Sequence, residues 1–147
     1  MKRLLLAVLV VAGLGTSAFA TDANNKVSTR AQNSFAEKFA GAQNVQWTAK
    51  ENFNKVSFTL ADEQVEAFFA TDGDLIGFSR KVDFKSLPLS GIQKIKKEYA
   101  DYTVRETIEF QQNDEKAFYV SLEKDGKRQI LEVSLYGNVS VFHGAGK

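Results

Sequence analysis

The stretch FAGAQNVQW (39–47) marks the point where the spacing of apolar residues changes from helical to extended. Upstream, Ala31 and Phe35 lie at four-residue steps leading to this stretch, which is the stripe of a short amphipathic helix. Inside it, Val45 and Trp47 alternate with polar residues, as in a half-buried strand with both side chains in the core. The stretch therefore predicts a helix that leads directly into a sheet.

The same change of period occurs a second time along the chain. The segment SLPLSGIQKIKKEYA (86–100) is helical in spacing, and its proline suits the first turn of a helix. A capping box of Thr29 and Gln32 is expected at the start of the first helix. Period-two segments, each predicted to be an antiparallel strand, occur at 45–49, 56–60, 65–69, 75–82, 104–110, 118–122, 131–135 and 139–142.

This order indicates an internal duplication. The stretch YADYTVRE (99–106) corresponds in role to FAGAQNVQW, and Gly73 corresponds to Gly137. The extra residues of the second half are expected in a hairpin loop, QQNDEK (111–116). We therefore predict an α+β fold, a tandem repeat of a helix followed by four antiparallel strands, with the helices packed on one face of the sheet. The repeats would be 30–85 and 86–143, within one domain of 30–147.

The acidic stretch TDGDLIGF (71–78) allows two interpretations, a calcium loop or a tight turn. Its counterpart is LYGNVSVF (135–142), in which the glycine recurs and the two aspartates do not. Calcium needs six or more oxygen ligands, and the later ligands of a calcium loop are missing here. A hairpin needs a residue with positive φ, which glycine supplies without steric cost. The pattern favours the turn, and no metal site is expected.

The first 20 residues have the layout of a secretory signal peptide. Lys2 and Arg3 precede an apolar run, and Ala18-Phe19-Ala20 places small residues where a signal peptidase cleaves. The run is too short to cross about 30 Å of hydrocarbon as a helix. Cleavage after Ala20 would leave a flexible segment, residues 21–29, ahead of the domain.

Charge and cysteine content restrict the partners and the compartment. Loss of Lys2 and Arg3 leaves 17 Lys and Arg against 18 Asp and Glu, so no basic excess is available for nucleic acid. The chain has no cysteine, and so it lacks the residue that carries the lipid anchor of a bacterial lipoprotein. We expect a periplasmic or secreted protein with no lipid anchor and no membrane insertion after cleavage.

The residue types required for catalysis are sparse. A nucleophilic triad needs a base, normally histidine, and the single histidine, His143, lies in a glycine-rich tail. Zinc coordination fails because there is no cysteine and no second histidine. Glu106 and Glu109 are most simply solvated surface charges. The sequence therefore predicts a protein that is not an enzyme and that needs no cofactor.

Several aromatic residues are out of phase with the predicted core. Phe53, Phe68 and Tyr119 would point to the side of the sheet away from the helices. If that side is open, they form a patch that binds a partner; the alternative is that the sheet curls and covers them. Asp62 and Glu63, at a predicted hairpin tip, are further candidates for partner binding, although solvated charge is the simpler interpretation.

These motifs together resemble the PepSY-like, beta-lactamase-inhibitor-like family of small exported bacterial proteins. The resemblance rests on FAGAQNVQW, on VEAFFATDGDLIGF (65–78) and on a helix that opens with Leu-Pro and ends IKKEYA (95–100). Family members usually carry proline where Ala40 and Ala100 stand here. The resemblance implies a non-enzymatic module that binds or inhibits another protein of the cell envelope. The alternative is a small-ligand carrier or envelope-stress protein with a cleft between the repeats.

Overall fold

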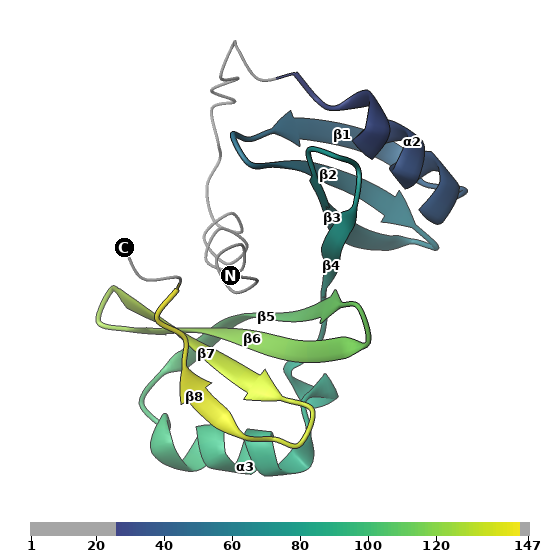
Figure 1. Cartoon of the computed structure of the whole chain (residues 1–147). Helices are drawn as coiled ribbons and strands as arrows, with labels where there is room; N and C mark the ends of the chain where they lie inside the picture. The colour runs from purple at the N-terminus through teal and green to yellow at the C-terminus, as the bar shows by residue number, and fades with distance from the viewer. Residues whose placement is uncertain (1–25, 145–147) are drawn as a thin grey trace. The chain divides into compact units, whose positions relative to one another are not determined.

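The computed structural model describes residues 26–144 (Figure 1). The predicted signal peptide, residues 1–20, lies outside the described residues, as does most of the predicted flexible segment 21–29. The elements follow in the order α2 (Thr29–Lys38), β1 (Gln43–Ala49), β2 (Phe53–Leu60), β3 (Glu63–Ala70), β4 (Leu75–Lys81), η1 (Phe84–Ser86), α3 (Leu89–Glu98), β5 (Thr103–Gln112), β6 (Glu115–Lys124), β7 (Lys127–Ser134) and β8 (Val139–Val141).

The strands form one eight-stranded antiparallel sheet, in which the order across the sheet is the order along the chain. The predicted class, α+β, agrees with this arrangement, but the predicted tandem repeat was wrong as a description of the fold. Neighbouring strands are hydrogen-bonded from β1 to β8, so the sheet does not divide into two four-stranded repeats. The halves also differ in strand length, because β4 has seven residues and β8 only three. Two α-helices, α2 and α3, accompany this sheet in residues 26–144.

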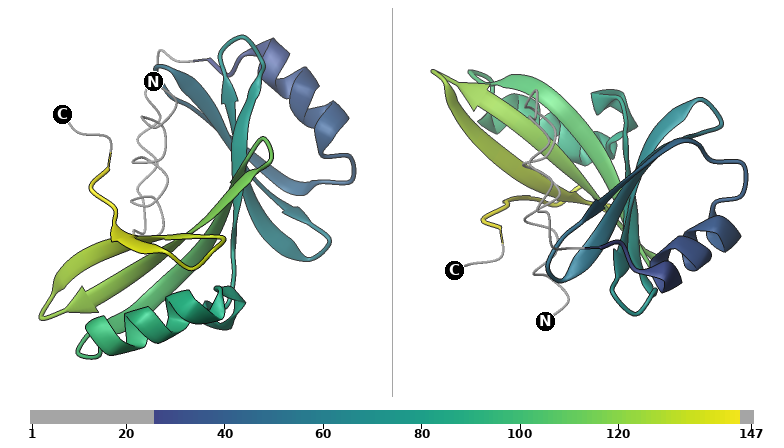
Figure 2. Two further views of the ribbon diagram at one scale, coloured as in Figure 1. Left: turned by 60° about the horizontal axis from the view of Figure 1, so that its bottom comes forward. Right: turned by 90° about the horizontal axis from the view of Figure 1, so that it is seen from above.

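The described chain divides into two compact units. The N-terminal unit comprises residues 26–81 and 110–115, and the C-terminal unit comprises residues 82–109 and 116–144. The tip of the β5–β6 hairpin therefore belongs to the N-terminal unit, although its strands begin and end in the other unit. Figure 2 shows α2 lying along strands of the first unit and α3 along strands of the second.

The core of the N-terminal unit is aromatic and centres on Phe35 of α2. Its ring centroid lies 5.0 Å from that of Phe58, 5.4 Å from Trp47 and 6.4 Å from Phe69. Edge-to-face contacts of this kind each add about 0.5–1.5 kcal/mol to the burial of apolar area. The helix begins one residue earlier than the expected capping box, because Ser28 is the N-cap and its Oγ accepts a hydrogen bond from the amide of Ala31. The predicted cap at Thr29 was therefore wrong.

The core of the C-terminal unit is largely aliphatic. Partly buried side chains surround seven buried residues, which are Leu87, Ile95, Phe118, Val120, Leu122, Leu131 and Val133. The helix approaches the sheet closely at Gly91, where an added Cβ would lie 2.9 Å from Cγ1 of Val133. Glycine at this position therefore sets the distance between α3 and β7.

Strand β1 contains a bulge that the sequence did not predict. The register of β1 against β2 shifts between Gln43 and Gln46, and Asn44 has a φ of 52°. This bulge leaves Val45 39% exposed, while Trp47 packs on the core as predicted. The predicted alternation of Val45 with Trp47 was wrong because a bulge interrupts the period of two.

The segment 111–116 is mainly strand and not the expected loop. Strands β5 and β6 each have ten residues and run to a two-residue turn at Asn113 and Asp114. The extra residues of the second half therefore lengthen a hairpin. This hairpin is long enough for its tip to join the N-terminal unit.

Candidate functional site

Two of the predicted partner-binding aromatics, Phe53 and Phe68, lie in the N-terminal unit and are buried. Phe53 is 6% exposed and Phe68 is 3% exposed. The ring of Phe68 lies 6.1 Å from that of Phe53 and 6.5 Å from that of Phe110, which the β5–β6 hairpin supplies. Of the two alternatives for these aromatics, the structure agrees with the one in which they are covered, because the rings of Phe53 and Phe110 both pack against Phe68. Their part in partner binding remains a prediction.

Tyr119, the third predicted aromatic, lies in the C-terminal unit and is 5% exposed. Its ring makes an edge-to-face contact with Phe142, with centroids 5.2 Å apart. Tyr119 therefore packs against the segment that follows β8. Tyr119 is thus also covered, the alternative that the period of two left open, since that period gives the face on which a residue lies but not what covers the face.

Asp62 and Glu63 lie at the β2–β3 turn and are exposed, as expected of surface charges. Ala61 and Asp62 both have positive φ, 49° and 64°, which is the geometry of a two-residue hairpin turn with a twist that suits the strands. Glu63 accepts a hydrogen bond from Nη1 of Arg80 at 2.8 Å. These two acids therefore lie apart from the buried Phe68, at the other end of β3.

The two glycine turns have the same backbone geometry in the two units. Gly73 has a φ of 98° and donates its amide to the carbonyl of Ala70 at 3.0 Å. Gly137 has a φ of 80° and donates its amide to the carbonyl of Ser134 at 2.9 Å. The prediction of a turn at each glycine is confirmed. Residues 26–144 contain no group of three or more His, Cys, Asp or Glu side chains that could hold a metal ion.

Each turn also rests on the second residue of a helix. A Cβ at position 73 would lie 2.9 Å from the backbone of Arg30, the second residue of α2. A Cβ at position 137 would collide with Oγ of Ser90, the second residue of α3, and would lie 2.8 Å from the amide of Gly91. The hydroxyl of Ser90 donates to the carbonyl of Tyr136 at 3.2 Å, which fixes the second turn against α3.

Three large apolar side chains around the second turn are exposed to solvent. Tyr136 is 86% exposed, Leu89 is 70% exposed and Leu135 is 49% exposed. Figure 1 shows the β7–β8 turn beside the start of α3, which places these residues at one end of the C-terminal unit. We call Leu89, Leu135 and Tyr136 the apolar tip. Contiguous exposed apolar side chains are typical of interaction sites, whereas single ones are not.

The corresponding positions of the N-terminal unit are polar. The first residue of α2 is Thr29 where α3 has Leu89, and the β3–β4 turn has Thr71 and Asp72 where the β7–β8 turn has Leu135 and Tyr136. All three polar residues are exposed as well. The backbone arrangement therefore does not require apolar residues at the tip.

The alignment of the two glycine turns could have predicted the apolar tip from the sequence, but the strand alternation was given more weight. Leu135 fits the alternation of Leu131 and Val133, and so it was assigned to a strand; β7 in fact ends at Ser134. The alignment of Gly73 with Gly137 places Leu135 and Tyr136 in a turn, where apolar residues are unexpected. Weighing the turn position above the alternation would have identified both residues as exposed.

A two-point ion pair of the C-terminal unit lies away from the apolar tip, near the turn that joins β6 to β7. Arg105 donates to Glu123 through Nε at 3.2 Å and through Nη2 at 2.9 Å. These hydrogen bonds hold the pKa of Glu123 below its usual range and raise the pKa of Arg105. Nearer the tip, Nζ of Lys94 lies 3.5 Å from the carbonyl of Val139. His143 is exposed, as expected for a residue close to the end of the chain.

Comparisons with known structures identify the fold. A DUF2874 family protein from Bacteroides uniformis superposes with a TM-score of 0.71 at 12% identity, covering 78% of this chain and 86% of its own. A Bacteroides eggerthii protein provisionally described as periplasmic matches with the same values. A BLIP-like protein from Bacteroides fragilis matches with a TM-score of 0.69 at 16% identity, covering 83% of this chain and 90% of its own. The sequence itself matches no family model and no curated protein.

The fold of this chain is thus that of BLIP-like and DUF2874 proteins, and the expected beta-lactamase-inhibitor-like resemblance is confirmed at the level of the fold. At these identities the likeness shows the fold alone. Within residues 26–144, no helix combines the length and the apolar character needed to cross a bilayer.

Proposed function

We propose that this chain is an exported, non-enzymatic module that binds another protein of the cell envelope, and that the apolar tip is its binding surface. The observation that carries the proposal is the exposure of Leu89, Leu135 and Tyr136 together, at positions that are polar in the N-terminal unit. Exposed apolar groups are kept at a cost in solubility, and tyrosine is among the residues enriched in binding hot spots.

The tip is ordered before any partner arrives. Oγ of Ser134 accepts hydrogen bonds from the amides of Tyr136 and Asn138, both at 3.2 Å. Ser90 holds the carbonyl of Tyr136 from the side of the helix. Binding to a turn that is already fixed loses less conformational entropy than binding to a mobile loop. Nζ of Lys94 lies beside the carbonyl of Val139 in β8, and so a partner with an acidic group next to an apolar pocket would complement this side of the surface.

Site-directed photo-cross-linking in cells tests the proposal. A benzophenone amino acid replaces Tyr136 in one variant and Asp72, the matching turn position of the N-terminal unit, in a control variant. We expect a discrete protein adduct from position 136, and loss of that adduct when Leu89→Ser is added. Equal adducts from both positions, or an adduct that persists with Leu89→Ser, would show that the tip is not the binding surface.

Export is part of the same proposal. The layout of residues 1–20 supports it, and so does the fold shared with a protein provisionally described as periplasmic. The shared fold with a BLIP-like protein supports an inhibitor-like role for the bound state. We expect the mature protein to begin at Thr21, which intact-mass measurement of the envelope fraction checks. An intact Met1, or recovery from the cytosol alone, would contradict export.

A further inference from the structure

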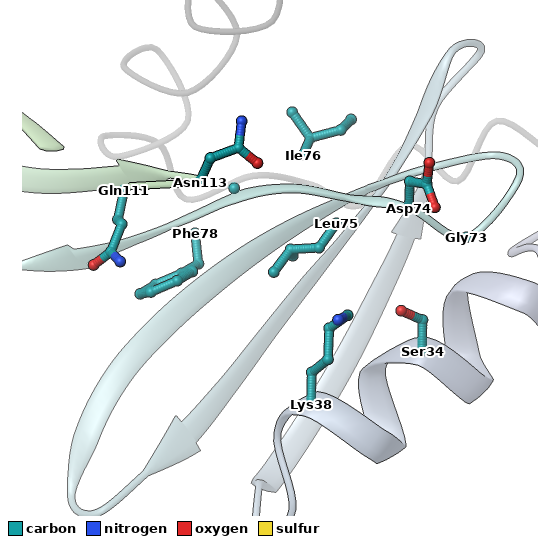
Figure 3. A pocket seen from close by; sticks show the side chains of 10 residues that line it. Ser34, Lys38, Gly73, Asp74, Leu75, Ile76, Phe78, Gln111 and Asn113 are labelled. Atoms are coloured by element: carbon teal, nitrogen blue, oxygen red, sulfur yellow. The ribbon is translucent and has the colours of Figure 1, made fainter. Parts of the chain in front are cut away.

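A recess lies wholly inside the N-terminal unit. It is a cleft of about 380 Å³ between α2, the first half of β4 with the turn before it, and the tip of the β5–β6 hairpin (Figure 3). This volume lies near the lower end of the range of about 300–1,000 Å³ for small-molecule sites. Its polar and aromatic lining residues include Ser34, Lys38, Asp74, Phe78, Gln111 and Asn113.

Close backbone contacts hold the walls of the cleft together. A Cβ at Gly77 would lie 2.6 Å from the ring of Phe110 and 2.7 Å from the carbonyl oxygen of Gln111, so β4 and the hairpin tip meet without a side chain between them. On the other side, Gly73 meets the backbone of Arg30 in α2. The cleft is therefore built into the fold of this unit, and it needs no movement to form.

The polar groups of the cleft lack partners within the described chain. Neither Lys38 nor Asp74 makes an ion pair with another residue of 26–144, and the side chains of Ser34, Gln111 and Asn113 make no hydrogen bond there. The amide of Asp74 is used in its turn, where it donates to Asp72, but its carboxylate is not. Figure 3 shows Lys38 and Ser34 extending from α2 toward β4, with Asp74 at the turn beside them.

This set of groups restricts the chemistry of a ligand. One ammonium and one carboxylate give the cleft no net charge, so a phosphate would meet the carboxylate of Asp74 and a divalent cation would find a single acidic ligand. A molecule with both a carboxylate and an ammonium would satisfy Lys38 and Asp74 together. Leu75 and Phe78 supply an apolar wall of β4 for the rest of the molecule. The amides of Gln111 and Asn113 and the hydroxyl of Ser34 can bond its remaining polar atoms.

We infer that this cleft binds a small zwitterion with an apolar side chain, such as a free amino acid or a very short peptide, with Lys38 on the carboxylate and Asp74 on the ammonium. The site lies in a different unit from the apolar tip. It therefore stands or falls independently of the proposed protein-binding function.

Titration of the ¹⁵N-labelled mature protein with L-phenylalanine, followed by amide chemical shifts, tests the inference. We expect saturable shifts at residues around the cleft, including Gly73, Gly77 and Gln111. Two analogues give the charge requirement: 3-phenylpropionate lacks the ammonium, and 2-phenylethylamine lacks the carboxylate. Each should bind at least about tenfold more weakly, as expected for the loss of one charged hydrogen-bond partner. Glycyl-L-phenylalanine distinguishes a peptide ligand from a free amino acid.

Matched variants locate the binding groups. Lys38→Met and Asp74→Asn should each weaken L-phenylalanine binding about tenfold or more. Lys50→Met and Asp62→Asn, which change exposed charges outside the cleft, should leave binding unchanged. The amide spectrum of each variant shows whether it is folded. Absence of saturable shifts with L-phenylalanine and its glycyl peptide, equal binding of the analogues, or equal binding by folded Lys38→Met and Asp74→Asn proteins would overturn the inference.

Discussion

The β3–β4 turn and the β7–β8 turn have the same backbone and different surfaces. Both place a glycine of positive φ against the second residue of a helix, and both close with a pair of hydrogen bonds between the strands. The first turn presents Thr71 and Asp72 to solvent, and the second presents Leu135 and Tyr136. The comparison teaches that the glycine and its helix contact specify the turn. The two residues before the glycine can therefore vary with the function of the surface.

The largest effect is expected at the glycines themselves. Gly137→Ala should lower the free energy of unfolding by about 2–5 kcal/mol, because positive φ costs roughly 1–2 kcal/mol and crowding against α3 adds about 1–3. Gly73→Ala should behave similarly, since its Cβ would meet the backbone of Arg30. Gly126→Ala is the control, because Gly126 has a φ of 73° and nothing within 4 Å of an added Cβ. Denaturant unfolding gives the three values; equal losses would show that helix contact does not constrain the turns.

The next effect concerns binding and separates the two turns. Tyr136→Ser should weaken affinity for the partner recovered by cross-linking by about 2 kcal/mol, roughly thirtyfold, as for a truncated hot spot. Its effect on unfolding should stay within about 0.5 kcal/mol, because the side chain is exposed. Asp72→Ser in the first turn should change neither quantity by more than that amount. Biolayer interferometry and denaturant unfolding measure the pair, and equal affinity for both variants would remove the distinction between the turns.

A smaller effect is expected from the side chains that brace each turn. Ser134→Ala removes an acceptor of two amide hydrogen bonds, and Asp72→Ala removes an acceptor of one, from Asp74 at 3.1 Å. We expect losses of about 1 and about 0.5 kcal/mol in unfolding free energy, since water can replace part of each bond at the surface. Thermal unfolding compares the two. A larger loss for Asp72→Ala would mean that the first turn depends more on its carboxylate than the geometry indicates.

The smallest effect is a pH dependence that belongs to the C-terminal unit. The pKa of Glu123 is lowered in the folded state by hydrogen bonds from Arg105, so its stabilising contribution is present above the usual carboxyl range. That contribution is lost as the pH falls through the lowered pKa. Glu123→Gln should therefore be slightly less stable than the wild type at neutral pH, and the difference should close on acidification. When both proteins also carry Arg105→Gln, the difference in stability caused by Glu123→Gln should not depend on pH. If it still does, another group causes the effect.

The parts of the fold that follow local spacing could be predicted from the sequence. Alternation at Val56 and Phe58 gave buried residues, and the glycines at 73 and 137 gave turns, because each depends on a few neighbouring residues. The bulge beside Val45 could not be predicted, since a bulge reflects how two strands fit together. For the same reason, the length of the β5–β6 hairpin was mistaken for a loop, because strand residues beyond the core are as polar as loop residues.

The candidate site was harder to predict, because exposure depends on distant segments. Phe68 was placed on the correct side of its strand, but Phe110 covers part of it, and Phe110 lies far along the chain. Leu135 fits the strand period and yet lies beyond the strand. The cleft could not be predicted from the sequence for a related reason. Lys38, Asp74 and Gln111 come from three separate segments, and none of them belongs to a motif.

The order of the strands has a consequence for folding of a chain that is synthesised from its N-terminus. Every strand is bonded to strands next to it in sequence, so each hairpin can close as soon as its second strand emerges. The N-terminal unit is the exception to this strand-by-strand assembly. Its residues 26–81 emerge early, but Phe110 and the hairpin tip emerge later. Until then, the side of Gly77 that Phe110 and Gln111 cover is exposed to solvent. The N-terminal unit is thus completed only after much of the C-terminal unit has been made.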